Sequence, residues 1–266
     1  EIKAAIQESR AGMDIARQAM AQARAEIAAA RARGDFDRHR NIDIDFDFDR
    51  DADLDGGSSP GAKLYTAARR CNDEEVRRLI TEEKADVNAV LRGDGTPLIA
   101  SVRRGCEDAV RVLLNAGADP NLASQGDGNP LIMAAERGNL EIAKLLIDSG
   151  ANVNGSSSGD GNPLIAASQR GKVDMAKLLI DRGADVNGYV EHDETPLINA
   201  AEQGRLDVAR LLVDRGAKVN LAYTVETARG GKELRSPLNM ALRHGHDDVA
   251  SYLRSKGAVA EPKPAN

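Results

Sequence analysis

A seven-residue stretch returns along this chain at a constant spacing. Gly-Asp-Gly-Asn-Pro-Leu-Ile occupies residues 126–132 and reappears at residues 159–165, 33 positions later. Thr-Pro-Leu-Ile stands one period earlier at residues 96–99 and one period later at residues 195–198, and a degenerate copy begins at Ser236. A unit this short cannot bury its own apolar face, so such units must stack on one another around a continuous core.

A second series confirms the register, because five asparagines are each 33 positions apart: Asn88, Asn121, Asn154, Asn187 and Asn220. Gly-Ala precedes most of them at a fixed distance, as at residues 117–118 and 150–151. Together these motifs resemble the ankyrin repeat, which has Thr-Pro-Leu, then Ala-Ala, Gly, paired leucines, Gly-Ala and Asn. The resemblance covers residues 61 to about 258. It implies an all-α solenoid of about six helix–turn–helix units joined by hairpin loops.

The repeat motif also predicts where each helix begins and ends. A Thr, Asn or Ser before each Pro is an N-cap type, Pro suits the first helical turn, and Gly ends each helix. The leucines after Pro should form one column: Leu98, Leu131, Leu164, Leu197 and Leu238. The first unit, around Leu64, lacks this Pro and is expected to be an N-terminal cap. Where the family has His after Pro-Leu, this chain has Ile, which predicts apolar packing in place of a hydrogen bond.

Residues 1–34 are expected to form an Ala- and Arg-rich amphipathic helix ahead of the repeats. Its larger apolar residues recur every seven positions, at Ile6, Met13, Met20 and Ile27. Two interpretations stay open. The helix pairs with another helix, within the chain or between chains, and so mediates self-association. Alternatively, it is a solvated helix that projects from the repeats.

Residues 35–60 contain an acidic alternating segment and a Gly/Ser linker. Ile or Phe alternates with Asp from Ile42 to Asp49, and Asp continues at every second position to Asp55. Period two is a strand pattern, but aspartates about 6.7 Å apart on one face repel by roughly 0.6 kcal/mol in water. The alternatives are a disordered linker or an extended segment docked on something basic. A calcium loop from Asp51 is disfavoured, because Ala62 stands where its twelfth-position Glu belongs. Residues 259–266 are expected to be a frayed tail.

Composition and missing motifs exclude several functions. The net charge of −6 argues against nucleic acid, and the chain has no apolar run long enough for membrane insertion. No catalytic, phosphate-binding, cofactor-binding or metal-ligand motif occurs, so we expect a non-enzyme without cofactor or metal. Cys71 and Cys106 sit at equivalent ends of neighbouring units and are expected to be small, partly buried residues that form no disulfide. The first residue is not Met, so the chain is expected to be part of a longer one.

The expected function is protein–protein recognition through the concave face and the hairpin tips. The second of the two residues that follow the helix's Ala-Ala or equivalent pair is Arg in four repeats, which gives the row Arg70, Arg104, Arg137 and Arg170. Either these cations favour helix C-termini, or they form a site for an acidic protein or peptide. Eight extra residues before Ser236 predict a lengthened hairpin finger, and insertions in repeats often serve binding. This region adds the candidates Tyr189, Tyr223, Val225, Arg229 and Lys232.

A narrower resemblance concerns the repeat variants, the long last hairpin and the helix before the array. These are similar to the C-terminal region of some bacterial membrane zinc peptidases of the beta-lactam-sensor type. That resemblance implies a sensing or docking module, with the peptidase itself upstream of this chain. The sequence leaves open whether such a soluble bacterial module lies in the cytoplasm or in the periplasm.

Overall fold

The computed structural model of the protein describes six stretches of the chain, and they form twelve helices and one two-stranded sheet: residues 59–91, 95–124, 128–157, 161–191, 193–226 and 231–260. The helices all belong to one compact unit, Phe48–Thr224 with Leu234–Asn266. Several expectations lie outside the described residues: the helix over 1–34, the acidic segment, the calcium loop and most of the tail. For these the predictions stand as made.

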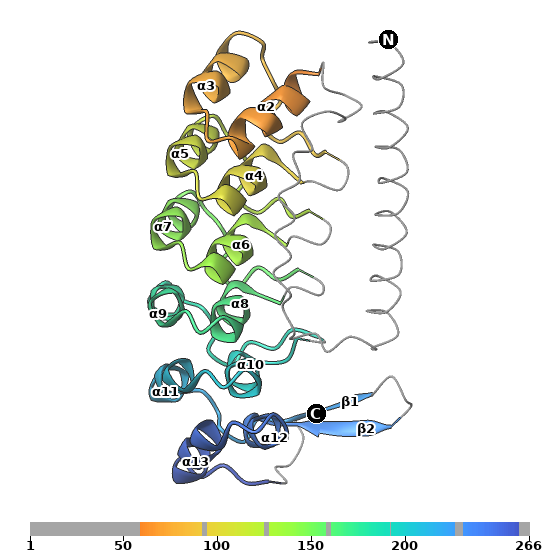
Figure 1. Cartoon of the computed structure of the whole chain (residues 1–266), viewed down its shortest axis with the longest axis vertical. Helices are drawn as coiled ribbons and strands as arrows, with labels where there is room; N and C mark the ends of the chain where they lie inside the picture. The colour runs from red at the N-terminus through yellow and green to blue at the C-terminus, as the bar shows by residue number, and fades with distance from the viewer. Residues whose placement is uncertain are drawn as a thin grey trace, which may run out of the picture. The chain divides into compact units, whose positions relative to one another are not determined.

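The helices alternate between two columns, which Figure 1 shows from the orange to the blue end of the array. The inner column consists of α2 Pro60–Arg69, α4 Pro97–Arg104, α6 Pro130–Arg137, α8 Pro163–Gln169, α10 Pro196–Glu202 and α12 Pro237–Arg243. The outer column consists of α3 Asp73–Thr81, α5 Glu107–Asn115, α7 Leu140–Asp148, α9 Val173–Asp181, α11 Leu206–Asp214 and α13 Asp247–Ser255. Each inner helix packs on its own outer helix and on the inner helices of the adjoining repeats. The predicted all-α solenoid of six units is therefore confirmed.

Each inner helix begins in the predicted way. The side chain before Pro accepts a hydrogen bond from the backbone N–H three residues later, as Asn129 does from Ile132 at 2.9 Å. The first repeat has Lys63 where the later repeats have Pro before Leu, as predicted, and its helix begins at a Pro further upstream. Pro60 opens α2 behind the N-cap Ser59, and α2 has ten residues where α4 has eight. The cap helix thus starts about one turn earlier than in the other repeats.

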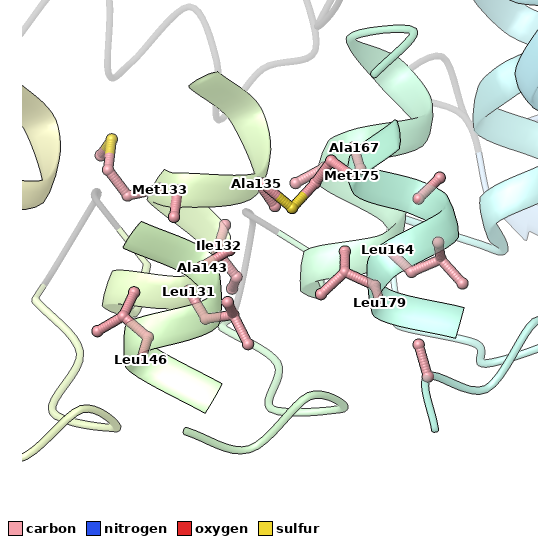
Figure 2. Close-up of a cluster of buried hydrophobic side chains, with 14 of the residues drawn as sticks. Leu131, Ile132, Met133, Ala135, Ala143, Leu146, Leu164, Ala167, Met175 and Leu179 are labelled. Carbon is pink, nitrogen blue, oxygen red and sulfur yellow. The ribbon is translucent and has the colours of Figure 1, made fainter. Parts of the chain in front are cut away.

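The predicted leucine column forms one continuous core. The five leucines after Pro are at most 2% exposed and belong to a single cluster of buried residues that runs through all six repeats. Figure 2 shows two layers of this cluster, with Leu131 above Leu146 in one repeat and Leu164 beside Leu179 in the next. Buried alanines such as Ala135 and Ala167 lie on the inner helices, where small side chains let neighbouring helices approach closely.

The isoleucines that replace the family's histidine pack against the hairpin glycine just before them. Ile132 and Ile165 are at most 1% exposed. A Cβ placed on Gly161 would lie 2.9 Å from Ile165 Cγ2, and one on Gly128 would lie 3.3 Å from Ile132 Cγ2. The isoleucine therefore occupies the space that a side chain at the glycine would need. This confirms the expected apolar packing.

The asparagine series forms a ladder between repeats. Each asparagine side chain donates to the carbonyl of a glycine in the next repeat and accepts a backbone N–H two residues further on. Asn121, for example, donates to Gly150 O at 3.0 Å and accepts from the Asn152 N–H at 2.7 Å. Asn220 does the same with Gly257 and Val259, at 3.0 and 2.9 Å. The fixed spacing in sequence is thus a fixed hydrogen-bonding pattern in space.

The inserted residues form the predicted hairpin. Strands β1 Tyr223–Glu226 and β2 Lys232–Arg235 pair as a two-stranded sheet (Figure 1). The shorter hairpins of the earlier repeats each close with a single antiparallel bridge, as between Ser124 and Gly128. The finger is therefore an elongated version of a loop that every full repeat has.

Candidate protein-recognition surface

The last turns of the inner helices form one surface, which we call the inner-turn surface. Each repeat contributes the two residues before the glycine that ends the inner helix, or before its replacement: Arg69-Arg70, Arg103-Arg104, Glu136-Arg137, Gln169-Arg170, Glu202-Gln203 and Arg243-His244. Successive turns lie close together. A Cβ placed on Gly138 would lie 3.0 Å from Lys172 Cδ in the next repeat, and one on Gly171 would lie 3.0 Å from Arg205 Cδ.

Side chains on this surface meet diagonally. The first member of one pair contacts the second member of the next, as Glu136 does with Arg170 at 3.8 Å and Glu202 with His244 at 3.4 Å. Arg170 therefore faces a carboxylate, and its side chain is only 27% exposed. Of the four predicted arginines, Arg70, Arg104 and Arg137 are exposed and Arg170 is half-buried.

The first repeats reverse the charge of this diagonal. Their first positions hold Arg69 and Arg103 where the third and fifth repeats hold Glu136 and Glu202. Five arginines stand in the last turns of three successive inner helices, and we call them the inner-turn arginine cluster: Arg69, Arg70, Arg103, Arg104 and Arg137. Like charges that are brought together lower the local cost of binding an anion.

A disulfide fixes two of these turns, which corrects the prediction that the cysteines stay unpaired. Cys71 directly follows Arg70, and Cys106 lies two residues after Arg104; their Cα atoms are 5.1 Å apart and their sulfurs are bonded. The prediction failed because the two positions are not equivalent. Cys71 stands where the next repeat has Gly105, whereas Cys106 is one residue later. A side chain at that glycine position points at the later position of the next repeat, as Gly138 shows toward Lys172.

Two predicted tyrosines meet at neighbouring hairpin tips. The rings of Tyr189 and Tyr223 stack with centroids 4.1 Å apart and planes at 23°. Tyr189 is 44% exposed, so the pair presents an aromatic face to solvent. Burial raises the pKa of both phenols, and the carboxylate of Glu194 adds to this for Tyr189. The two hydroxyls therefore stay protonated at neutral pH and can donate hydrogen bonds.

The other finger candidates are placed separately. Val225 is half-buried in β1, and Lys232 is exposed in β2. Both belong to the second compact unit, Glu1–Asp47 with Val225–Glu233. Arg229 lies outside the described residues.

Two family profiles match the chain. The profile described as ankyrin repeats in three copies matches residues 131–223 and 190–263, and the profile described as ankyrin repeats in many copies matches residues 98–147. The chain belongs to the ankyrin repeat family. No curated protein matches it. Ankyrin repeats are in general protein-interaction modules, which agrees with the expected class of function.

In this ankyrin repeat protein, sequence reasoning missed a second link between repeats. Glu194 occupies the hairpin position that is Gly95, Gly128 and Gly161 in earlier repeats, and it keeps their left-handed backbone with φ of 55°. Its side chain is buried, and Arg235 Nη1 of β2 donates to its Oε1 at 2.9 Å. The signal was present, because a Glu replaces a repeat glycine just before Thr-Pro-Leu.

Further buried polar groups surround that link. Asp193 and Glu202 are 8% and 5% exposed, and Asn199 donates through Nδ2 to the Asp193 carbonyl. Burial raises the pKa of the Glu194 carboxyl, and the charges of Glu202 and Asp193 add to this, whereas the Arg235 guanidinium opposes it. The base of the finger is thus held by a buried polar network in place of apolar packing.

Among the residues that the structure describes, no three His, Cys, Asp or Glu side chains gather so that they could hold a metal ion. Nor does any helix among those residues have the length and apolar character to cross a membrane.

Proposed function

We propose that this ankyrin repeat protein is a recognition module that binds an acidic segment of a partner protein through its inner-turn arginine cluster. The tyrosine pair of Tyr189 and Tyr223 is proposed as a second contact. The observation that carries the proposal is a reversal of charge: where the third and fifth repeats have Glu136 and Glu202, the first two have Arg69 and Arg103. A partner segment that carries several carboxylates has the charge complementary to this row of arginines.

The chemistry of the cluster favours carboxylates as the partner's groups. Guanidinium groups donate in a fork that matches a carboxylate, so specificity goes with charge. Single exposed ion pairs contribute only about 0–1 kcal/mol each. Recognition therefore requires several acidic residues at once, spread over the turns of three repeats. An acidic stretch of roughly ten residues in extended form meets that requirement, because it spans about 33 Å.

The test is direct binding of a labelled acidic peptide. We expect a fluorescein-labelled Glu decamer to bind the chain at low ionic strength and a Gln decamer to bind far more weakly. Arg104→Glu with Arg137→Glu should weaken binding by about tenfold or more, since two ion pairs of up to about 1 kcal/mol are lost. Arg254→Glu is the matched control, because Arg254 lies in the last turn of the outer helix α13. Equal loss in the control and in the cluster variant contradicts the proposal.

A second candidate is favoured by the disulfide. Bonded cysteines are typical of oxidising compartments outside the cytoplasm. The chain then fits an extracytoplasmic sensing or docking module of a larger membrane-anchored protein, such as the zinc peptidases that the sequence resembles. Differential alkylation and mass spectrometry on protein from the cells that naturally make it decide this. Oxidised Cys71 and Cys106 support the candidate, and two free thiols remove it.

A further inference from the structure

We propose that Asn154 and Asn187 are sites of spontaneous deamidation, and that the hydrogen bonds of the asparagine ladder gate this reaction. Each of the two stands directly before a glycine, at Gly155 and Gly188. Glycine favours the reaction, because it has no side chain to shield its backbone nitrogen and it adopts many backbone conformations once a loop opens. The other three ladder asparagines precede larger residues: Ala89, Leu122 and Leu221.

The reaction uses groups of the chain and water alone. The backbone nitrogen of Gly155 gives its proton to hydroxide and bonds to Cγ of Asn154, the Cγ–Nδ2 bond breaks, and ammonia leaves. The cyclic imide that results then takes up one water molecule at either of its carbonyls, which opens the ring to aspartate or isoaspartate. In sum, an amide and water become a carboxylate and an ammonium ion, with no change of oxidation state.

The fold restrains both reacting groups at Asn154. Its Nδ2 donates to Gly183 O at 3.1 Å, and its Oδ1 accepts from the Asp185 N–H at 2.8 Å. The attacking nitrogen is engaged as well, because the Gly155 N–H donates to the Asn152 carbonyl at 2.9 Å. Ring closure requires all these bonds to break, so the reaction waits for the loop to open locally. Asn154 is exposed, so water and hydroxide can reach it.

Asn187 repeats this arrangement one repeat later. Its Nδ2 donates to Gly216 O at 3.2 Å, and its Oδ1 accepts from the Lys218 N–H at 2.8 Å. The Gly188 N–H donates to the Asp185 carbonyl at 3.0 Å. The two sites therefore share one gate design, although each depends on a different neighbouring repeat.

The N-caps of two inner helices account for the two glycines. Asn129 Nδ2 donates to the Gly155 carbonyl at 3.3 Å, and a Cβ on Gly155 would lie 3.3 Å from that nitrogen. A Cβ on Gly188 would lie 3.5 Å from Nδ2 of the N-cap Asn162. Repeats with a threonine N-cap have leucine at the position of these glycines: Leu122 after Thr96, and Leu221 after Thr195. The reactive pairs are thus confined to the third and fourth repeats.

Deamidation removes one bond of the ladder. A carboxylate at residue 154 still accepts from the Asp185 N–H, but it has no hydrogen to donate to the Gly183 carbonyl. Two oxygens then face each other where a hydrogen bond was, which weakens the joint between the third and fourth repeats. The reaction does not reverse by itself, so each event permanently loosens one joint of the array.

The first test follows each asparagine by peptide mass spectrometry while the full chain is incubated in mildly alkaline buffer, folded or unfolded in urea. In urea we expect Asn154 and Asn187 to deamidate about tenfold or more faster than Asn121, which precedes Leu122. We also expect both rates to be about tenfold or more lower in the folded chain, because the loops must open first. In urea, rates no higher than that of Asn121 overturn the sites. Equal rates in the folded and unfolded chain overturn the gate.

The second test weakens a single step of the ladder. The carbonyl of Gly216 accepts the bond from Asn187, its φ is 94°, and a Cβ there would meet no atom within 4 Å. Alanine at this position strains the left-handed backbone by roughly 1 kcal/mol, which corresponds to about fivefold more of the open loop. We expect Gly216→Ala to speed deamidation about fivefold at Asn187 and to leave Asn154 unchanged.

Gly257→Ala is the matched control. Gly257 has φ of 87° and equally open surroundings, and it accepts the ladder bond of Asn220, which precedes a leucine. This variant should leave the rates at Asn154 and Asn187 as they are in the unchanged chain. An unchanged rate at Asn187 in Gly216→Ala, or an equal acceleration at both asparagines, overturns the ladder as the gate.

Discussion

The Glu194 carboxylate and the Arg235 guanidinium join a hairpin of the fifth repeat to strand β2 across 41 positions of sequence, at 2.9 Å. Glu194 is 2% exposed, so the pair lies in a poorly solvated place. Arg235→Met should therefore lower the free energy of unfolding by about 3 kcal/mol, because it leaves a buried carboxyl without its cation. Urea unfolding followed by circular dichroism measures this. Arg254→Met, on the exposed face of α13, should change stability by less than about 0.5 kcal/mol.

The carboxyl of Glu194 also makes the free energy of unfolding depend on pH. Because burial raises the folded-state pKa of Glu194 above its unfolded value, the folded state binds the proton more tightly. The stability that this tighter proton binding adds to the folded state is fully present below the unfolded pKa of about 4.3. It is lost as pH rises through the folded pKa of Glu194. Glu194→Gln removes the titration, so the unchanged chain should lose stability relative to this variant between pH 4 and 7. A constant difference across that range, in urea melts, contradicts the assignment.

The disulfide predicts that the stability of the N-terminal cap repeat depends on redox conditions. The bond of Cys71 with Cys106 closes a loop of 35 residues, and the chain-entropy model gives such a loop up to about 4 kcal/mol. Dithiothreitol should accelerate amide hydrogen exchange in α2 and α3 far more than in α12, because repeats contact only their neighbours. The double variant Cys71→Ala with Cys106→Ala should not respond to the reductant. Equal protection of α2 with and without reductant would refute the stabilising role of the bond.

Lys84 offers a substitution that should stabilise the protein. It stands where the later repeats have Gly117 and Gly150, and it shares their left-handed backbone with φ of 53°. Lys84→Gly should raise the free energy of unfolding by roughly 1 kcal/mol.

The reverse substitution in the next repeat is its control. A Cβ on Gly117 would meet no atom within 4 Å, so Gly117→Lys tests the backbone conformation alone. It should destabilise the protein by a similar amount. If both substitutions are neutral, the left-handed positions carry no strain.

Much of this architecture was predictable because the repeat fixes many positions at once. The leucine column, the N-caps and the spacing of Asn121 follow from one motif read in phase. The links between repeats were harder to foresee. Cys71 and Glu194 each occupy a repeat glycine position, and their partners Cys106 and Arg235 become neighbours only when repeats stack. Contacts of this kind depend on the direction of each Cα–Cβ bond. The spacing of equivalent residues along the sequence does not give that direction.

The arginine row was predictable as a pattern but not as a site. Arg170 belongs to the same series as Arg104, yet only the structure brings it against Glu136. The row as read from the sequence does not distinguish Arg170 from its three exposed counterparts. It also leaves out Arg69 and Arg103, which stand one residue before Arg70 and Arg104.

A reversal of peptide preference tests the central claim most directly. The whole chain has a net charge of −6, so non-specific attraction favours a Lys decamer over a Glu decamer. The account predicts that the unchanged chain nevertheless prefers the Glu decamer, and that Arg104→Glu with Arg137→Glu prefers the Lys decamer. Fluorescence anisotropy titrations with both labelled peptides give the two ratios of dissociation constants. A preference for the Lys decamer in both proteins would contradict the claim that the arginine cluster recognises acidic partners.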